Sequence, residues 1–121
     1  MDLVEAVQHG RMDSVVTMFE HGNDIFMNHN GVSLVHIAAK HHQLACLEFL
    51  IKRGLDINLK NDNGETPLHI FVTTDTANSE AREVAEFLVN HGADPFIKDK
   101  LGDTPMSRTQ RMKKKDLIQI L

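Results

Sequence analysis

Two short phrases built around glycine recur along the chain in the same order. The first is a glycine followed two residues later by aspartate, and it occurs at Gly22, Gly54 and Gly92. The second is a turn glycine at the head of a short apolar segment, and it occurs at Gly31, Gly64 and Gly102. Glycines of the second set are 33 and 38 residues apart. A period of this length indicates similar units, each too small to bury its own apolar surface, that stack on their neighbours to form one continuous core.

The residues within each unit are typical of two short helices. In the second unit, apolar side chains at 35–39 and again at 44–51 follow the spacing of one helical face. Thr–Pro pairs stand at 66–67 and 104–105, where the hydroxyl can cap a helix and the proline needs no N–H partner. The glycines of the first phrase are expected to end the second helices as left-handed caps.

Three tetrapeptides carry a more specific signal. The one at 66–69 reads Thr-Pro-Leu-His, the one at 33–36 reads Ser-Leu-Val-His, and the one at 104–107 reads Thr-Pro-Met-Ser. With their spacing, these motifs resemble the ankyrin repeat, whose period is about 33 and whose signature is T-P-L-H-x-A. The resemblance covers essentially the whole chain and implies an all-α fold, an ankyrin-repeat solenoid of helix-turn-helix units with β-hairpin turns. Residues 1–121 would form a single domain, with repeats at about 1–29, 30–62, 63–100 and 101–121.

Two departures from the family pattern concern turns. The segment from Gly22 to Gly31 is one residue shorter than its two counterparts, so we expect a tighter or irregular first hairpin. Ankyrin repeats usually place glycine between their two helices, as Gly10 does in the first unit, whereas the second unit has His42 there. The resemblance therefore predicts a positive φ at His42, which costs a residue other than glycine roughly 1 kcal/mol.

A third departure is an insertion of five residues between Val72 and Val84. The polar, short side chains at 73–79 predict a loop, with Asn78 or Ser79 as the N-cap of the following helix. Insertions in repeat proteins map to loops on one face, often the binding face, and a tolerated insertion is the alternative. Ankyrin units of large DNA viruses carry similarly stretched loops, so the resemblance raises the hypothesis of a viral host-modulating protein.

A fourth departure places Arg108 and Thr109 where an inner repeat has apolar residues against the next unit. We interpret this polarity as that of a terminal cap, at which the array ends. Residues 108–115 also hold five positive charges and no negative one, which gives 108–121 a net charge of +4 with Asp116 counted, and leaves the remainder at −8. The alternatives are a solvated terminal turn, which we favour, and a nuclear-localisation or phosphate-binding patch.

Histidine and cysteine are the residues that could carry chemistry. The eight histidines are at positions 9, 21, 29, 36, 41, 42, 69 and 91, and no two have the three- or four-residue spacing of a helical zinc site. The resemblance instead implies that His36 and His69 bridge adjoining turns by hydrogen bonds. Cys46 stands at an apolar helical position, which predicts a buried, inert thiol. With no nucleophile or phosphate-binding motif, we expect no enzyme activity, no metal and no cofactor.

Composition restricts the class of protein further. The chain is 41% hydrophobic and 25% charged with a net charge of −4, which is typical of a folded domain. No uncharged apolar run is long enough to cross a bilayer, and no leader sequence opens the chain, so secretion is not expected. One cysteine suits a reducing compartment, the cytoplasm or the nucleus. The acidic balance argues against general nucleic-acid binding.

The resemblance implies that the chain binds another protein, because family members bind through their hairpin tips and the concave face of their first helices. We therefore predict a non-catalytic interaction module that masks or scaffolds a partner, with no nucleic acid, membrane or small-molecule substrate. Carried over by position, its surface comprises Gln8, His9, His29, Asn30, Val32, Lys40, His41, Asp62, Asn63, Glu65, Thr73, Thr74, Lys100, Leu101 and Asp103. The alternatives are an inhibitor of a Rel-type transcription factor and a structural fragment of a larger scaffold. The histidines predict an interface sensitive to pH at about 6–7.

Overall fold

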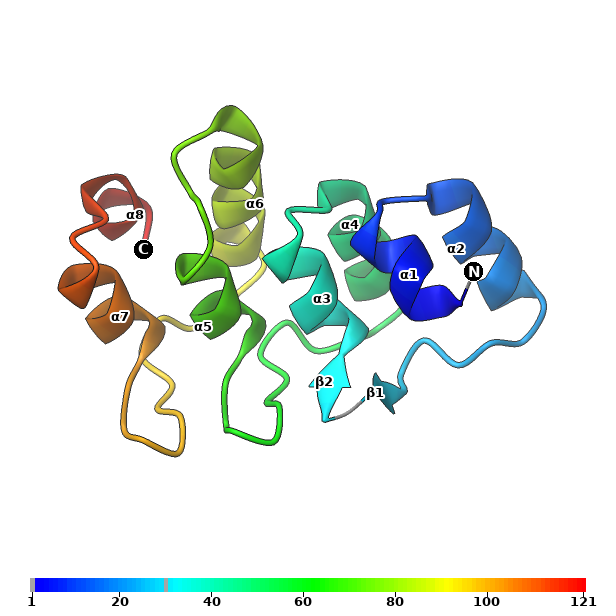
Figure 1. Cartoon of the computed structure of the whole chain (residues 1–121), viewed down its shortest axis with the longest axis horizontal. Coiled ribbons are helices and arrows are strands. Elements are labelled where there is room, and N and C mark those ends of the chain that lie inside the picture. The colour runs from blue at the N-terminus through cyan, green and yellow to red at the C-terminus, as the bar shows by residue number, and fades with distance from the viewer. Residues whose placement is uncertain (1, 30) are drawn as a thin grey trace.

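Helix pairs are stacked side by side in the structure, a computed structural model that describes residues 2–29 and 31–121. The helices form two rows, with α1, α3, α5 and α7 in one row and their partners in the other (Figure 1). The helices are α1 (Leu3–Gln8), α2 (Met12–Glu20), α3 (Leu34–Lys40), α4 (Leu44–Lys52), α5 (Pro67–Val72), α6 (Ser79–Asn90), α7 (Pro105–Arg111) and α8 (Lys115–Ile120). The predicted all-α stack of helix-turn-helix units is confirmed.

The helices of the first row begin at the capping residues that the sequence indicates. Thr66 and Thr104 accept hydrogen bonds from amides three residues later, and proline follows each of them. Ser33 caps α3 in the same way. In the insertion, Asn78 rather than Ser79 is the N-cap of α6, and its side chain accepts from the amide of Ala81.

Left-handed residues end the helices as predicted. Gly22, Gly54 and Gly92 have φ between 88° and 97°. The prediction for His42 is also confirmed, with a φ of 55°. Lys113, which the sequence analysis did not single out, occupies the same turn of the fourth unit and has a φ of 57°.

The hairpin loops project from one edge of the stack (Figure 1). In the first, β1 (Asn28–His29) pairs antiparallel with β2 (Val32–Ser33), so two residues separate the last pair of the ladder. In the second, Asn61 donates its amide to Glu65 O across three residues. The third hairpin repeats the second, because the amide of Asp99 donates to Asp103 O. The first hairpin is therefore tighter, as its shorter segment predicts.

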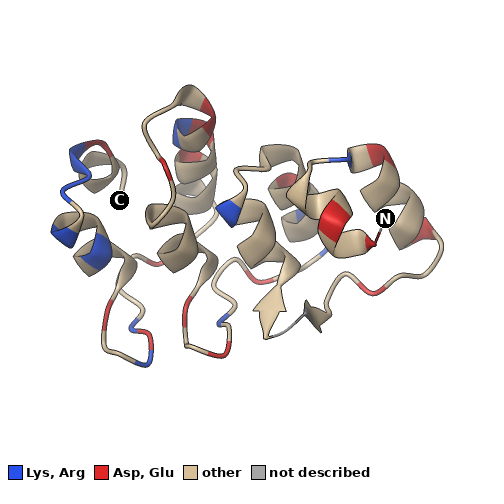
Figure 2. Ribbon diagram, viewed as in Figure 1, with Lys and Arg blue, Asp and Glu red and all other residues tan. Residues whose placement is uncertain are grey.

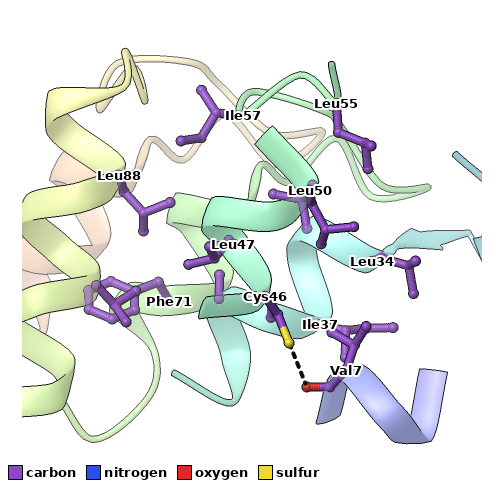
Figure 3. Packing of buried hydrophobic residues seen from close by; sticks show 14 of the residues in the cluster. Val7, Leu34, Ile37, Cys46, Leu47, Leu50, Leu55, Ile57, Phe71 and Leu88 are labelled. Atoms are coloured by element: carbon purple, nitrogen blue, oxygen red, sulfur yellow. Dashed lines mark hydrogen bonds between the residues drawn. The ribbon is translucent and has the colours of Figure 1, made fainter. Parts of the chain in front are cut away.

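A single hydrophobic core runs through all four units. Figure 3 shows side chains of successive units, among them Val7, Leu47 and Phe71, converging on this core. The first-row helices pack in order, α1 on α3, α3 on α5 and α5 on α7. Burial of each large apolar side chain contributes about 1.5–3 kcal/mol. Neighbouring units therefore supply the stability that one helix pair lacks.

Two buried histidines link consecutive units through hydrogen bonds to the backbone. The Nε2–H of His36 donates to Glu65 O at 2.7 Å, and that of His69 donates to Asp103 O at 3.0 Å. In His69 the other ring nitrogen accepts from the amide of Thr66, which fixes a neutral ring. Burial lowers the pKa of both histidines. The bridging role implied by the resemblance is thus confirmed.

Arg108 and Thr109 were interpreted as the polar side of a terminal cap, but both side chains are engaged inside the molecule. The Arg108 side chain, only 12% exposed, turns back toward the third unit and pairs with Glu65 Oε2 at 2.6 Å and Asp99 Oδ2 at 2.7 Å. Thr109 is fully buried and donates its hydroxyl to Pro105 O. Both polar side chains thus have polar partners inside the molecule. The stretch that begins at Arg108 is therefore not simply a solvated turn.

The buried ion pairs of Arg108 give a first prediction. We expect Arg108→Ala to lower the free energy of unfolding by about 3 kcal/mol, because it leaves the carboxylates of Glu65 and Asp99 unpaired. The matched control is Arg111→Ala, which removes an exposed pair with Asp103 and should cost less than about 1 kcal/mol. Urea unfolding followed by circular dichroism measures both. Equal losses for the two variants would contradict the argument from burial.

The same variant is expected to depend on pH. Burial raises the pKa of Asp99, but hydrogen bonds from the Asp103 amide and Arg108 outweigh it, and the net pKa is lowered. The pKa of Glu65 is also lowered, by Asn61 and Arg108 against the effect of burial. Carboxylates of this kind stabilise the fold above their unfolded pKa of about 4 and lose that contribution as the pH falls through their lower folded pKa. The penalty of Arg108→Ala should therefore stay constant from about pH 7 to about pH 5 and shrink as the pH falls below about 4, which urea unfolding at each pH measures.

Substitutions at His42 separate its backbone strain from its contacts. His42 Nε2 donates to Thr74 Oγ1 at 2.7 Å, since the Thr74 hydroxyl is itself donated to Phe71 O. The His42 ring also packs against Phe71 with centroids 5.4 Å apart. His42→Ala and His42→Gly lose the same contacts, but only glycine adopts a positive φ without strain. We expect the alanine variant to be less stable than the glycine variant by at least about 1 kcal/mol in urea unfolding. The reverse order would contradict the assignment of strain.

Candidate partner-binding surface

The first-row helices α1, α3 and α5 leave a groove of about 400 Å³ between them. Its floor is apolar and includes Val4, Ile37 and Ile70. Polar side chains stand at the ends of the helices above this floor, and they are Gln8, Lys40, His41 and Thr73. The groove therefore combines an apolar base with a polar rim, as small binding sites do.

Helical spacing explains why these side chains share one face. Val4 and Gln8 are four residues apart on α1, and Ile37 and Lys40 are three apart on α3. The opposite faces of the same helices, which carry Ala6, Val7 and Ala38, are buried in the core. The stack fixes the helices, and so the groove is held open by rigid elements.

The structure brings together five of the residues predicted from the sequence to bind a partner. They line the groove and are Gln8, Val32, Lys40, His41 and Thr73. His9 follows Gln8 directly, as the C-cap of α1. Thr74 is not available in the same way, since its hydroxyl is shared between Phe71 O and the His42 ring.

The remaining predicted residues belong to the hairpins, away from the groove. Exposed positions there are Asp62, Asn63, Lys100 and Leu101, with Asp103 half-buried. Glu65 differs from the expectation that packing leaves these positions free, because its carboxylate is bound by Arg108 and Asn61. The backbone of His29 is in β1 but its side chain lies outside the described part of the chain, as does Asn30.

Sequence reasoning missed the floor of the groove. Val4, Ile37 and Ile70 were not distinguished from core residues, because an apolar helical pattern does not show which members a neighbour will cover. Asn61, which also lines the groove, was not among the predicted binding residues. A signal was present in the spacing, since Val4 and Ile37 stand one turn before Gln8 and Lys40 on the same faces.

The groove lining is unusual in its charge. It includes Lys40 and His41 but no aspartate or glutamate. The pKa of His41 is lowered, first by burial and then by the nearby charges of Lys40, His9 and His42. His41 is therefore neutral near pH 7 and becomes positively charged only in more acidic solution. The sensitivity of a partner interface to pH remains a prediction.

A second hollow, of about 480 Å³, lies between the insertion and the turn that joins α7 to α8. Its lining mixes Asp75 and Asp116 with lysines 113–115. Figure 2 shows Lys and Arg residues gathered on α7, on the turn that follows it and at the start of α8. Lys114 Nζ donates to Thr74 O, which attaches the start of the insertion to the fourth unit. The lining carries both charges, so it does not select an anion.

The structure also places the side chains that could bind a metal or act as a nucleophile. In that part of the chain, no three His, Cys, Asp or Glu side chains are placed so that they could hold a metal ion. Cys46 is buried, with its Sγ 3.3 Å from Met12 Sδ and 4.0 Å from Val7 O (Figure 3). Burial raises the pKa of this thiol to about 11. None of the helices described is both long and apolar enough to cross a membrane.

Comparison with known families identifies the architecture. A family model described as ankyrin repeats (three copies) matches residues 3–99 and, in a second match, residues 36–121. The chain belongs to the ankyrin-repeat family. Ankyrin repeats are generally protein–protein interaction modules, and the family is typically non-enzymatic.

One curated relative of this ankyrin-repeat chain comes from Caenorhabditis elegans and is described as Arf-GAP with ANK repeat and PH domain-containing protein cnt-1. The two are 35% identical over 63 residues. The match covers 52% of this chain but only 8% of the relative. The similarity therefore concerns about half of the ankyrin-repeat chain and a small part of a much longer protein.

The burial of Cys46 predicts a thiol that is protected by the fold. A thiol with a pKa of about 11 is almost wholly protonated at about pH 8, and the thiolate is the form that reacts. We expect native protein to react with Ellman's reagent at least about a hundredfold more slowly than protein unfolded in guanidinium. Cys46→Ala provides the blank. Equal rates in the native and unfolded protein would contradict the buried position.

Proposed function

We propose that this ankyrin-repeat protein is a non-catalytic module that holds a segment of a partner protein in the groove between α1, α3 and α5. The observation that carries the proposal is the half-exposed apolar floor formed by Val4 and Ile70 on helices whose other faces are fixed in the core. Partly exposed apolar side chains in a concave site gain free energy when a partner removes them from water.

The mechanism is occlusion and does not involve covalent chemistry. A rigid groove loses little conformational entropy when it binds, so its contacts are converted efficiently into affinity. A partner segment bound in the groove is masked from other proteins. Binding of this kind would serve either an inhibitor or a scaffold. The described groove and hairpins carry no feature specific to Rel-type transcription factors, so the proposal is not restricted to that class.

The hairpin tips extend the surface on one side of the groove. Leu101 is 88% exposed at the third tip, and Asp62 and Asn63 are exposed at the second. Tips of this kind add contacts at the edge of an interface, where exposed charges affect association rates more than affinity. The groove is therefore expected to supply most of the binding energy.

Filling the groove tests the proposal. In Thr73→Trp the indole would occupy the groove from an exposed position at the end of α5. The matched control is Thr17→Trp on α2, since both threonines are exposed and donate their hydroxyl to a carbonyl three or four residues earlier. Affinity purification with quantitative mass spectrometry compares the variants with the wild-type chain.

We expect one discrete partner to be retained by wild type and Thr17→Trp and reduced at least about tenfold by Thr73→Trp. Circular dichroism checks that both variants are folded. A partner that is retained equally by the two tryptophan variants, or lost equally from both, would exclude the groove as its binding site.

A further inference from the structure

We propose that the groove takes an acidic segment of its partner, with an apolar side chain on the floor and a carboxylate against Lys40 and His41. This inference rests on the proposed function, because it concerns the occupant of the same groove. It specifies the chemistry of that occupant from the charges that surround the site.

The charge of the groove is opposite to that of the chain. The whole sequence holds 17 acidic and 13 basic residues, for a net charge of −4. The groove lining nevertheless contains Lys40 and no carboxylate. Complementary charge at an interface selects partners and speeds their association, so a site with this polarity favours a negatively charged segment.

Glu65, an acidic residue next to the groove, is bound by other groups. Asn61 lines the groove and donates its amide to Glu65 Oε1 at 3.0 Å. The other oxygen of Glu65 pairs with Arg108, which also neutralises the buried Asp99. The carboxylate of Glu65 is therefore compensated within the molecule and repels an acidic ligand less than a free carboxylate would.

Several main-chain carbonyls at the opposite end also have hydrogen-bond partners. The amides of His41, His42 and Gln43 donate to carbonyls of the last turn of α3. The carbonyl of Gln8, at the end of α1, accepts from the side chain of Gln43 at 2.9 Å. These bonds reduce the exposed negative potential where the helix ends meet the groove.

Lys40 and His41 are free to bind a ligand. Lys40 is exposed, and within the described part of the chain it makes no ion pair. His41 is exposed beside it and presents ring nitrogens that can donate to an oxygen. An ammonium group with three donors next to an imidazole is a suitable pair for one carboxylate.

The dimensions of the groove restrict the ligand to a short segment. A volume of about 400 Å³ holds only a few side chains. Ile37, on the floor, is three residues before Lys40 on the same face of α3. An apolar side chain on Ile37 and Ile70 therefore places the next one or two residues of the partner near Lys40, and these are the residues expected to be acidic.

Selection from a library of random twelve-residue peptides displayed on phage tests this inference with the purified chain. Enriched peptides are synthesised and their affinities measured by fluorescence anisotropy for wild type and three variants. Lys40→Glu reverses the proposed charge, and Lys98→Glu makes the same change in net charge at an exposed loop position outside the groove. Thr73→Trp reports whether a peptide occupies the groove at all.

We expect the enriched peptides to be rich in aspartate and glutamate and to bind Thr73→Trp more weakly than wild type. Their affinity should fall about tenfold with Lys40→Glu but less than about twofold with Lys98→Glu. Peptides that depend on the groove but are neutral or basic, or that the two lysine variants affect equally, would overturn the acidic occupant and leave the proposed function standing. A selection without any peptide sensitive to Thr73→Trp would count against both.

Discussion

Stacking of neighbouring units is the constraint on which the rest of the structure depends. Each helix pair has one apolar side that faces the next pair, and the core is continuous from Leu3 to Leu117 only because the pairs are in contact. Small side chains such as Ala6 and Ala38 are fully buried where the first-row helices meet. The faces of α1, α3 and α5 that this packing does not cover form the groove. The distance between the helices therefore determines the shape of the site.

Polar groups set the register of the stack. His36 and His69 reach from one unit to the backbone of the next. Burial lowers the pKa of both rings, and in His69 the Nδ1 that accepts from the Thr66 amide carries no proton. The fourth unit has Ser107 at this position, and its short side chain bonds to Thr104 within the same unit. Arg108 reaches backward instead, so the junction between the third and fourth units is linked from both sides.

Local features of the fold could be read from the sequence, and distant ones could not. The caps at Thr66 and Thr104 and the left-handed His42 follow from the residues next to them and from the repeat phase. Arg108 could not be placed, because its partner Glu65 is 43 residues away and no local pattern connects the two. The position of each residue within the repeat predicted part of the groove rim correctly. Ile37 could not be distinguished from a core residue, because the sequence does not show how α1 and α5 pack beside it.

The insertion in the third unit leaves the groove intact because the backbone is already closed where the insertion begins. The hydroxyls of Thr73 and Thr74 donate to Ile70 O and Phe71 O, which completes the last turn of α5 before the extra residues start. Lys114 then bonds to Thr74 O, as Gln43 bonds to Gln8 O at the corresponding position two units earlier. The loop is thus attached toward α8, and only Thr73 belongs to the groove. A change in repeat length can therefore be accommodated beside the binding surface without altering the surface itself.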